Sequence, residues 1–183
     1  MKIFDYLEDL YEYIKDNEWD DVENRYRKVS VKLAGKDIIA DIDDVNLDGY
    51  EEDLEAVLSE TVEKCEDEGY AALYFEYDMD EDWESSFSCY SRYTAEGEDE
   101  EEEWMENLED KSEGPTLPDF GEIYKKYCAG DDARSAGVML YLIVKTVCAL
   151  GRRLENIQTS SLAVCIGYSN QLPIWRIREI ETS

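Results

Sequence analysis

One long segment of this chain is apolar on nearly every side of a helix, and it constrains the fold more than any other feature. It covers residues 131–153 and reads DDARSAGVMLYLIVKTVCALGRR. A helix without a polar face has to be buried. Asp131 and Asp132 are suited to cap its first amides, and Gly151 followed by two arginines suits its negative end. We therefore expect a central buried helix over about residues 132–152, with other elements packed on several sides of it.

The chain has the size and composition of one folded domain. It has 183 residues, of which 43% are hydrophobic and 12% are aromatic, which is enough to build a core. No internal repeat and no linker rich in proline and serine divides it. We expect a single domain over residues 1–183, with an acidic loop insertion at about residues 96–117 that includes a short helical turn.

Hydrophobic periodicity predicts the remaining elements. Apolar residues at helical spacing mark helices at residues 2–17, 50–67 and 118–127. The strand candidates form three pairs, at residues 28–33 and 38–42, 70–78 and 85–93, and 162–169 and 174–180. The predicted order is α-β-β-α-β-β-α-α-β-β. Because paired strands follow each other through short turns, the predicted fold class is α+β, with a mainly antiparallel sheet and helices packed on it.

The chain is strongly acidic, and the acid is unevenly distributed. The net charge is −29, and residues 1–132 hold 44 of the 47 acidic side chains but 12 of the 18 basic ones. The C-terminal part is therefore the neutral part that builds the core, and the rest presents acid to solvent. Such a field repels nucleic acid and anionic membranes and attracts basic surfaces. We expect a basic protein as partner, with no nucleic acid and no membrane.

Targeting signals and cysteine usage favour a cytoplasmic protein. The apolar run at residues 137–144 is stopped by Lys145 and is too short to cross a bilayer. The N-terminal residues MKIFDYLEDLYEY lack the apolar region of a secretory signal. The five cysteines form an odd set without a CxxC motif, which indicates buried thiols in a reducing compartment.

No catalytic pattern is present. The chain has no histidine, which removes serine or cysteine mechanisms that use a histidine base and zinc sites that contain histidine. A pair of carboxylates could still serve a glycosidase or a metal-dependent reaction, but nothing marks a specific pair among so many. The sequence therefore predicts a protein that is not an enzyme and needs no cofactor.

A calcium loop is the sharpest motif match. Residues 44–55 read DVNLDGYEEDLE, with Asp44, Asn46 and Asp48 at loop positions one, three and five and Glu55 at position twelve. Against this, the preceding residues resemble a strand, and no second loop exists for pairing. The other interpretation is a turn followed by a helix whose first turn is acidic. Calcium binding stays an alternative, and we assign no metal ligand.

Two acidic stretches contain a tryptophan each. An aromatic side chain ringed by charge is typical of an interface anchor with an electrostatic rim. The alternative is that each tryptophan covers the core while the acids face water. We expect the protein-binding surface to comprise two groups, which are Asp78, Asp80, Asp82 and Trp83, and Glu98, Asp99, Glu100, Glu101, Glu102, Glu103 and Trp104.

Small size, strong acidity, absence of histidine and α+β architecture together resemble the bacterial immunity proteins and antitoxins that neutralise toxins. The segment LPDFGEIYKKY is similar to the Leu-Pro-plus-aromatic helix entry of one large immunity superfamily. The Asn-Gly-Gly-like continuation of that motif is missing, so we carry over no residue from it. The resemblance implies a binding protein that occludes the basic active site of a cognate toxin.

A DNA-mimic inhibitor, such as an anti-restriction protein, is the runner-up. Such a protein spreads carboxylates at phosphate-like spacing along an elongated shape. Composition does not separate this reading from the first. The uncharged C-terminal core favours the compact immunity protein.

Overall fold

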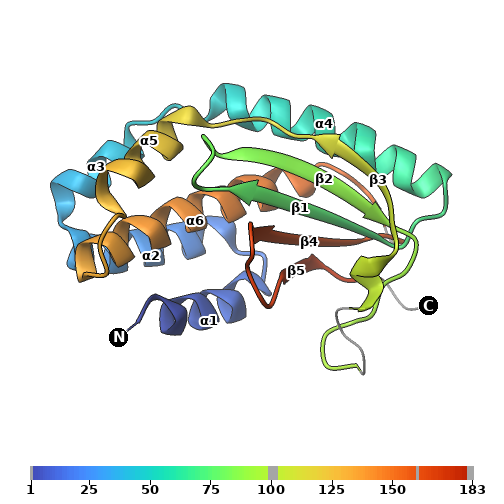
Figure 1. The fold of residues 1–183 in the computed structure, drawn as a ribbon, viewed down its shortest axis with the longest axis horizontal. Coiled ribbons are helices and arrows are strands. Elements are labelled where there is room, and N and C mark those ends of the chain that lie inside the picture. Colours follow the sequence, from blue (N-terminus) through green and yellow to red (C-terminus); the bar gives the residue numbers. More distant parts are fainter. Residues whose placement is uncertain (1, 99–102, 160, 181–183) are drawn as a thin grey trace.

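The computed structural model describes residues 2–98, 103–159 and 161–180, and Figure 1 shows their fold. The described residues form an α+β domain, as predicted. The helices are α1 (Ile3–Ile14), α2 (Trp19–Ala34), α3 (Lys36–Asp43), α4 (Asp48–Asp67), the 3-10 helix η1 (Glu103–Glu106), α5 (Pro118–Tyr127) and α6 (Ala133–Leu154). The strands are β1 (Ala72–Asp78), β2 (Glu84–Tyr90), β3 (Leu108–Glu113), β4 (Ala163–Tyr168) and β5 (Trp175–Arg178).

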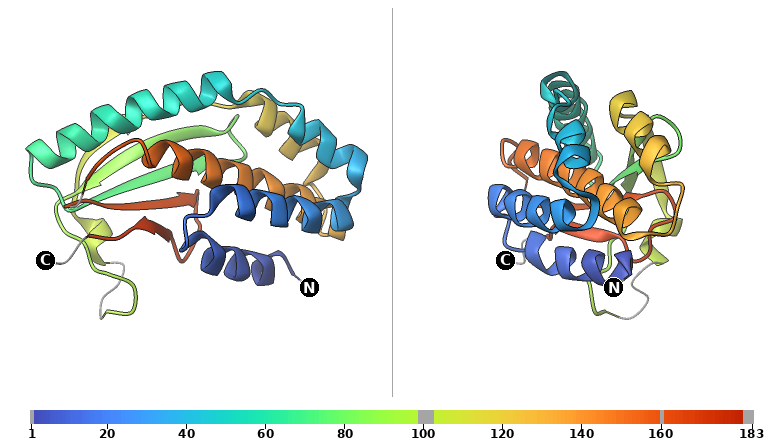
Figure 2. Two further views of the ribbon diagram at one scale, coloured as in Figure 1. Left: turned by 180° about the vertical axis from the view of Figure 1, so that it is seen from behind. Right: turned by 90° about the vertical axis from the view of Figure 1, so that its left-hand side faces the viewer.

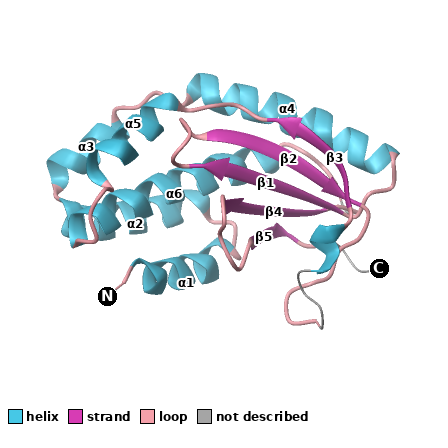
Figure 3. Cartoon of the chain, in the orientation of Figure 1, coloured by secondary structure: helices cyan, strands magenta, loops and turns pink. Residues whose placement is uncertain are grey.

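The five strands form one mixed sheet in the order β3-β2-β1-β4-β5 (Figure 3). Strand β1 pairs antiparallel with β2 and parallel with β4, and the two outer pairings are antiparallel. The sheet is therefore mainly antiparallel, as expected. The parallel pairing requires a crossover, which α5 and α6 supply.

The central helix predicted at residues 132–152 is confirmed as α6, whose cap Asp132 accepts a hydrogen bond from the Ser135 amide. Figure 2 shows α6 between the sheet and α2. Glycines allow α2 to approach closely. A Cβ atom on Gly137 would lie 2.7 Å from the Leu33 Cβ, and one on Gly151 would collide with the Trp19 ring.

The two faces of the sheet differ in what covers them. Alternate β1 residues on one face, among them Phe75 and Tyr77, join the main core with α6 and α4. On the other face Tyr74 belongs to a small cluster with Trp104 of η1. Towards the β1–β2 turn this second face becomes polar, and its Glu76 is partly exposed. On this face, carboxylates therefore lie between the small cluster and the β1–β2 turn.

The β-hairpin predicted over residues 28–42 is wrong, because these residues form α2 and α3. The alternation of Val29, Val31 and Leu33 covers too few residues to set the period. Over a longer window the buried positions of α2 are spaced by three or four, as in a helix. These positions are Trp19, Val22, Tyr26 and Ser30. Gly35, with φ of 95°, then breaks the helix.

The acidic insertion at residues 96–117 is more structured than a loop. Its helical turn is present as η1, but residues 108–113 form the edge strand β3. This strand was missed because its sequence, LEDKSE, is charged and lacks β-branched residues. An edge strand with one solvated face tolerates charge, and charge protects it from pairing with other chains.

The expectation for the cysteines is partly wrong. Cys65 of α4 and Cys89 of β2 are joined in a disulfide, so the expectation of five free thiols is wrong for this pair.

Helix α6 is the one helix in the described ranges that is long and apolar enough to cross a membrane. Of its apolar window, 72% is buried inside the domain, as in the core helix of a soluble protein.

Candidate interaction surface

The first predicted group lies at the turn between β1 and β2. Asp78 ends β1, and its side chain accepts a hydrogen bond from the Asp80 amide at 3.0 Å. Asp80 and Asp82 are exposed, and Asp78 is partly exposed. We call the five acidic residues of this turn the hairpin-end carboxylates: Asp78, Asp80, Glu81, Asp82 and Glu84.

Trp83 does not belong to the surface. It is 0% exposed, and its Nε1 donates to Thr146 Oγ1 of α6 at 3.0 Å. Its ring stacks on Tyr77 and meets Phe120 edge to face, with 5.5 Å between centroids in both cases. The expectation that Trp83 contacts a partner is therefore corrected. The alternative reading, in which the tryptophan covers the core, describes this residue.

The turn is held in an unusual backbone conformation. Asp82 and Trp83 have φ values of 51° and 58°, in the left-handed region that residues other than glycine rarely adopt. Helix α5 holds the turn in place. The Leu117 amide donates to the Asp82 carbonyl at 3.2 Å, and a Cβ atom on Gly121 would lie 2.9 Å from the Asp82 Cα. The turn is thus fixed by packing, so its carboxylates project from a preorganised backbone.

Negative charge accumulates at this turn. Asp78 faces Glu84 directly across the β1–β2 ladder. Lys125 of α5 approaches Asp82 at 3.0 Å, and this hydrogen bond raises the pKa of Lys125. Burial and then the charge of Asp80 raise the pKa of the Tyr124 hydroxyl. Most of the carboxylate charge at this end is therefore presented to solvent.

The second predicted group lies at the opposite end of the sheet. Glu98 and Glu103 are exposed, while Asp99, Glu100, Glu101 and Glu102 lie outside the described residues. Trp104 is 2% exposed and packs edge to face on Tyr90 and Tyr93, so it too is a core residue and not an anchor. Because β2 has seven residues, the described members of the second group lie near the far end of a strand roughly 20 Å long, away from the β1–β2 turn. These described members do not form one surface patch with the first group.

Helix α4 presents a third acidic group, which sequence reasoning did not single out. Its 20 residues extend roughly 30 Å, and Figure 1 shows it along one border of the molecule. Its one basic residue, Lys64, pairs with Asp110 at 2.6 Å. The signal was present as helical spacing of acids opposite the apolar face. The exposed members, here named the α4 carboxylates, are Asp48, Glu52, Asp53, Glu60, Glu63, Glu66 and Asp67.

The calcium loop predicted as an alternative at residues 44–55 is not formed. Helix α4 begins at Asp48, the fifth loop position, so the remaining positions are helical. Asn46 Oδ1 accepts a hydrogen bond from the Asp48 amide at 2.8 Å. Glu55, the twelfth position, pairs with Arg153 of α6 at 2.8 Å. Asp44 is an exposed turn residue. The acidic helix start is the interpretation that agrees with the structure.

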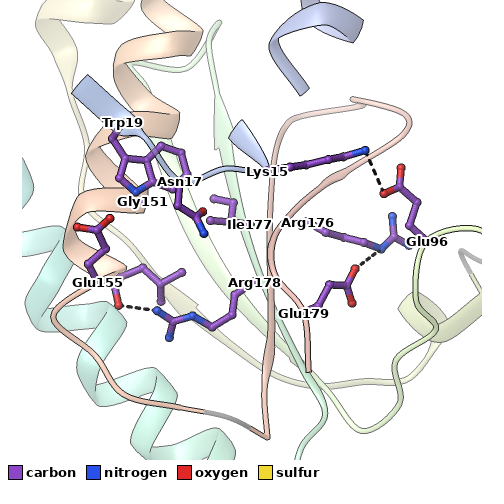
Figure 4. Close-up of a pocket in the computed structure, with 11 residues that line it drawn as sticks. Lys15, Asn17, Trp19, Glu96, Gly151, Glu155, Arg176, Ile177, Arg178 and Glu179 are labelled. Carbon is purple, nitrogen blue, oxygen red and sulfur yellow. Dashed lines mark hydrogen bonds and ion pairs between the residues drawn. The ribbon is translucent and has the colours of Figure 1, made fainter. Parts of the chain in front are cut away.

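A polar pocket of about 410 Å³ lies where α1, α2, the end of α6 and β5 meet (Figure 4). Its guanidinium groups already have partners. Arg178 donates to the Leu154 carbonyl at the end of α6 at 2.9 Å, and Arg176 lies 3.9 Å from Glu179. We interpret the polar groups that line the pocket as a network that holds β5 against the C-terminal end of α6.

Two further kinds of group in the described residues are metal-ligating side chains and free thiols. These residues contain no group of three or more histidine, cysteine, aspartate or glutamate side chains arranged to hold a metal ion. Burial raises the pKa of the free thiols of Cys128, Cys148 and Cys165 to about 12. Near neutral pH these thiols are protonated and are poor nucleophiles. The exposed carboxylates can bind a basic partner through charge.

Comparisons with protein-family models, curated proteins and solved structures find no match for this chain. Any function proposed for it therefore depends on its own residues.

Proposed function

We propose that this chain is a non-enzymatic inhibitor, an immunity protein that occludes the basic active site of a cognate toxin in the cytoplasm. The supporting observation is where the charges lie. Several lysine and arginine side chains form ion pairs within the domain. Lys145 pairs with Glu23 at 2.8 Å, and Arg152 pairs with Glu23 at 2.6 Å. The hairpin-end carboxylates and the α4 carboxylates stay at the surface, where they attract a basic protein.

The charge favours rapid association. Opposite charges steer diffusional encounter and raise association rates, and salt weakens the effect. A toxin that acts on nucleic acid or on a phosphate-bearing cofactor needs a positive cleft, and a surface dense in carboxylates fits such a cleft. Fast capture is what an immunity protein requires. The preorganised β1–β2 turn lowers the ordering cost of binding.

Helix α4 favours a second candidate, a DNA-mimic inhibitor. Along its exposed side the α4 carboxylates recur at steps of three, four or seven residues, apart from the adjacent pairs Glu52/Asp53 and Glu66/Asp67, over a length of roughly 30 Å. A row of negative charge on a straight rod resembles one strand of duplex DNA. A protein that acts this way binds many DNA-binding proteins and competes with DNA for them.

Affinity capture from a lysate of the source organism at low salt, followed by elution with salt, tests both candidates. We expect one basic protein, whose activity the chain inhibits in a purified assay. The double variant Asp80→Lys/Glu84→Lys should slow its association at least tenfold, whereas Glu60→Lys/Glu63→Lys should slow it clearly less, because it weakens only the general attraction and not the contact surface. The reverse pattern, with DNA competing for the partner, would favour the DNA mimic. Capture of no basic protein would contradict both.

The compartment has its own test. A structural disulfide is rare in the cytoplasm, where thiols are kept reduced. If the protein is cytoplasmic, rapid alkylation of thiols in intact cells should modify Cys65 and Cys89 once the protein is denatured. Recovery of this pair as a disulfide would contradict the cytoplasmic location and leave the inhibitor proposal intact.

A further inference from the structure

The most exposed large apolar side chain in the described ranges lies at the same end of the sheet as the hairpin-end carboxylates. It is Leu172, 71% exposed, in the turn that connects β4 to β5. Because β4 runs parallel to β1 and next to it, this turn begins where β1 ends. The Ser169 amide donates to the Tyr77 carbonyl at 2.8 Å, so the turn starts one strand spacing from Asp78.

The turn that presents Leu172 is anchored on both sides. Before it, the Gln171 amide donates to the Tyr168 carbonyl at 2.8 Å, and Gln171 Oε1 accepts from the Tyr168 amide at 3.0 Å. After it, Ile174 and Trp175 are each 3% exposed and belong to the core. Leu172 therefore projects from a fixed backbone, and little conformational entropy would be lost when a partner covers it.

An isolated exposed leucine is common on protein surfaces and needs no explanation. Here the leucine is combined with a fixed turn and with five carboxylates whose first member, Asp78, lies one strand spacing from the start of that turn. Among the described residues Lys125 is the cation that the ion pairs place on this group. An apolar anchor beside a charged rim is the arrangement of an interface hot spot. Trp83, which was predicted for this role at this end of the sheet, is buried, and Leu172 is an exposed apolar residue there.

We infer that Leu172 is the apolar anchor of a docking surface whose rim is the hairpin-end carboxylates. The surface fits a basic protein partner that places a small apolar recess between lysine or arginine side chains. This inference rests on the proposed function and adds to it where the partner binds and what chemistry recognises it. It requires the partner to supply apolar contact as well as positive charge.

Two synthetic peptides test the inference without knowledge of the natural partner. One alternates lysine and leucine, and the other has the same number of lysines separated by serine. Titration at low salt, followed by backbone amide NMR, should show tighter binding of the lysine–leucine peptide with shifts at residues 78–84 and 169–174. Leu172→Ala should weaken that peptide about tenfold, the cost of losing most of a buried leucine, and leave the lysine–serine peptide unchanged.

Leu108→Ala is the matched control. Leu108 is also an exposed leucine, at 51%, but it begins β3 at the opposite end of the sheet, so its loss should change neither affinity. Leu172→Met should retain the preference. Equal binding of the two peptides to the natural chain, or equal loss in both alanine variants, would overturn the inference while leaving the acidic inhibitor possible. Failure of both peptides to bind at low salt would count against the proposed function itself.

Discussion

Asp78 lies directly opposite Glu84 on the neighbouring antiparallel strand, so two carboxylates of like charge face each other at the end of the sheet. Directly opposed like charges destabilise a sheet by roughly 0.2–1 kcal/mol. The pairing costs stability in the free protein. A partner that places a cation between the two side chains would remove that cost, which gives the arrangement a use in binding.

Removing one charge of this pair should therefore stabilise the free protein. We expect Glu84→Gln to raise the free energy of unfolding by about 0.5 kcal/mol, measured by urea denaturation. Glu60→Gln on α4 is the control and should change it less, because Glu60 is an exposed helix residue with no carboxylate opposite it in a ladder. A destabilised Glu84→Gln variant would show that the pair is not repulsive.

Trp83→Phe should destabilise the protein through a lost hydrogen bond. The indole Nε1 donates to Thr146 Oγ1, and this hydroxyl in turn donates to the Leu142 carbonyl at 2.8 Å. Without the indole, one buried acceptor site is unsatisfied, and we expect a loss of about 1–3 kcal/mol.

Trp104→Phe is the matched control for this experiment. Within the described residues its Nε1 is buried without a hydrogen-bond partner, so replacing it with phenylalanine removes no bond. We expect a clearly smaller loss of stability than for Trp83→Phe in the same thermal or urea denaturation. Equal losses would indicate that ring volume, and not the Thr146 hydrogen bond, dominates at residue 83.

The ion pairs of Glu23 should make stability depend on pH. Burial acts to raise the pKa of Glu23, but hydrogen bonds from Lys145 and Arg152 outweigh it, and the pKa lies below its usual 4.5. A lowered pKa in the folded state means that the stabilisation is complete above the unfolded pKa and is lost as pH falls through the folded one. The difference in unfolding free energy between the natural chain and Glu23→Gln should shrink as pH drops below about 4.5. A constant difference from pH 6 to pH 3 would contradict this.

Reduction of the disulfide should lower stability. Cys65 and Cys89 are 24 residues apart in sequence, and closing a loop of that size is worth about 3 kcal/mol. The oxidised protein should show three titratable thiols in denaturant, from Cys128, Cys148 and Cys165, and the reduced protein should unfold at lower urea concentration. The variant Cys65→Ala/Cys89→Ala should be insensitive to reductant. Five thiols after purification in air would show that the bond does not form.

Much of the fold could be predicted because long periodic segments determine their own structure. The absence of a polar face identified α6, and apolar spacing identified α1 and α4. The prediction for the α2–α3 segment was wrong because a five-residue alternation of valine and leucine fits both the strand period and the helix period. Tertiary packing determines that the segment is helical. Trp19 lies against Gly151 of α6, a contact between residues far apart in the chain.

The candidate site was less predictable, since exposure is a property of the folded chain. The acids of the hairpin end were recognisable from composition, but whether Trp83 faced water depended on Thr146, which lies 63 positions later. Leu172 gave no signal at all, because single exposed leucines are common and the sequence does not mark which one has a role. The α4 carboxylates were visible as a helical pattern, and no rule marked them as more than a solvated face.

The parallel pairing of β1 with β4 has a consequence for how the chain reaches this fold. Strand β1 lies inside the finished sheet, yet its second neighbour β4 follows it in the chain only after β2, β3, α5 and α6. Until then, one side of β1 is an open row of backbone donors and acceptors, a template for the strand of another chain. The acidic surplus would then act between copies of the chain itself. Half-formed molecules repel one another, and we expect them to aggregate more readily as salt screens that repulsion.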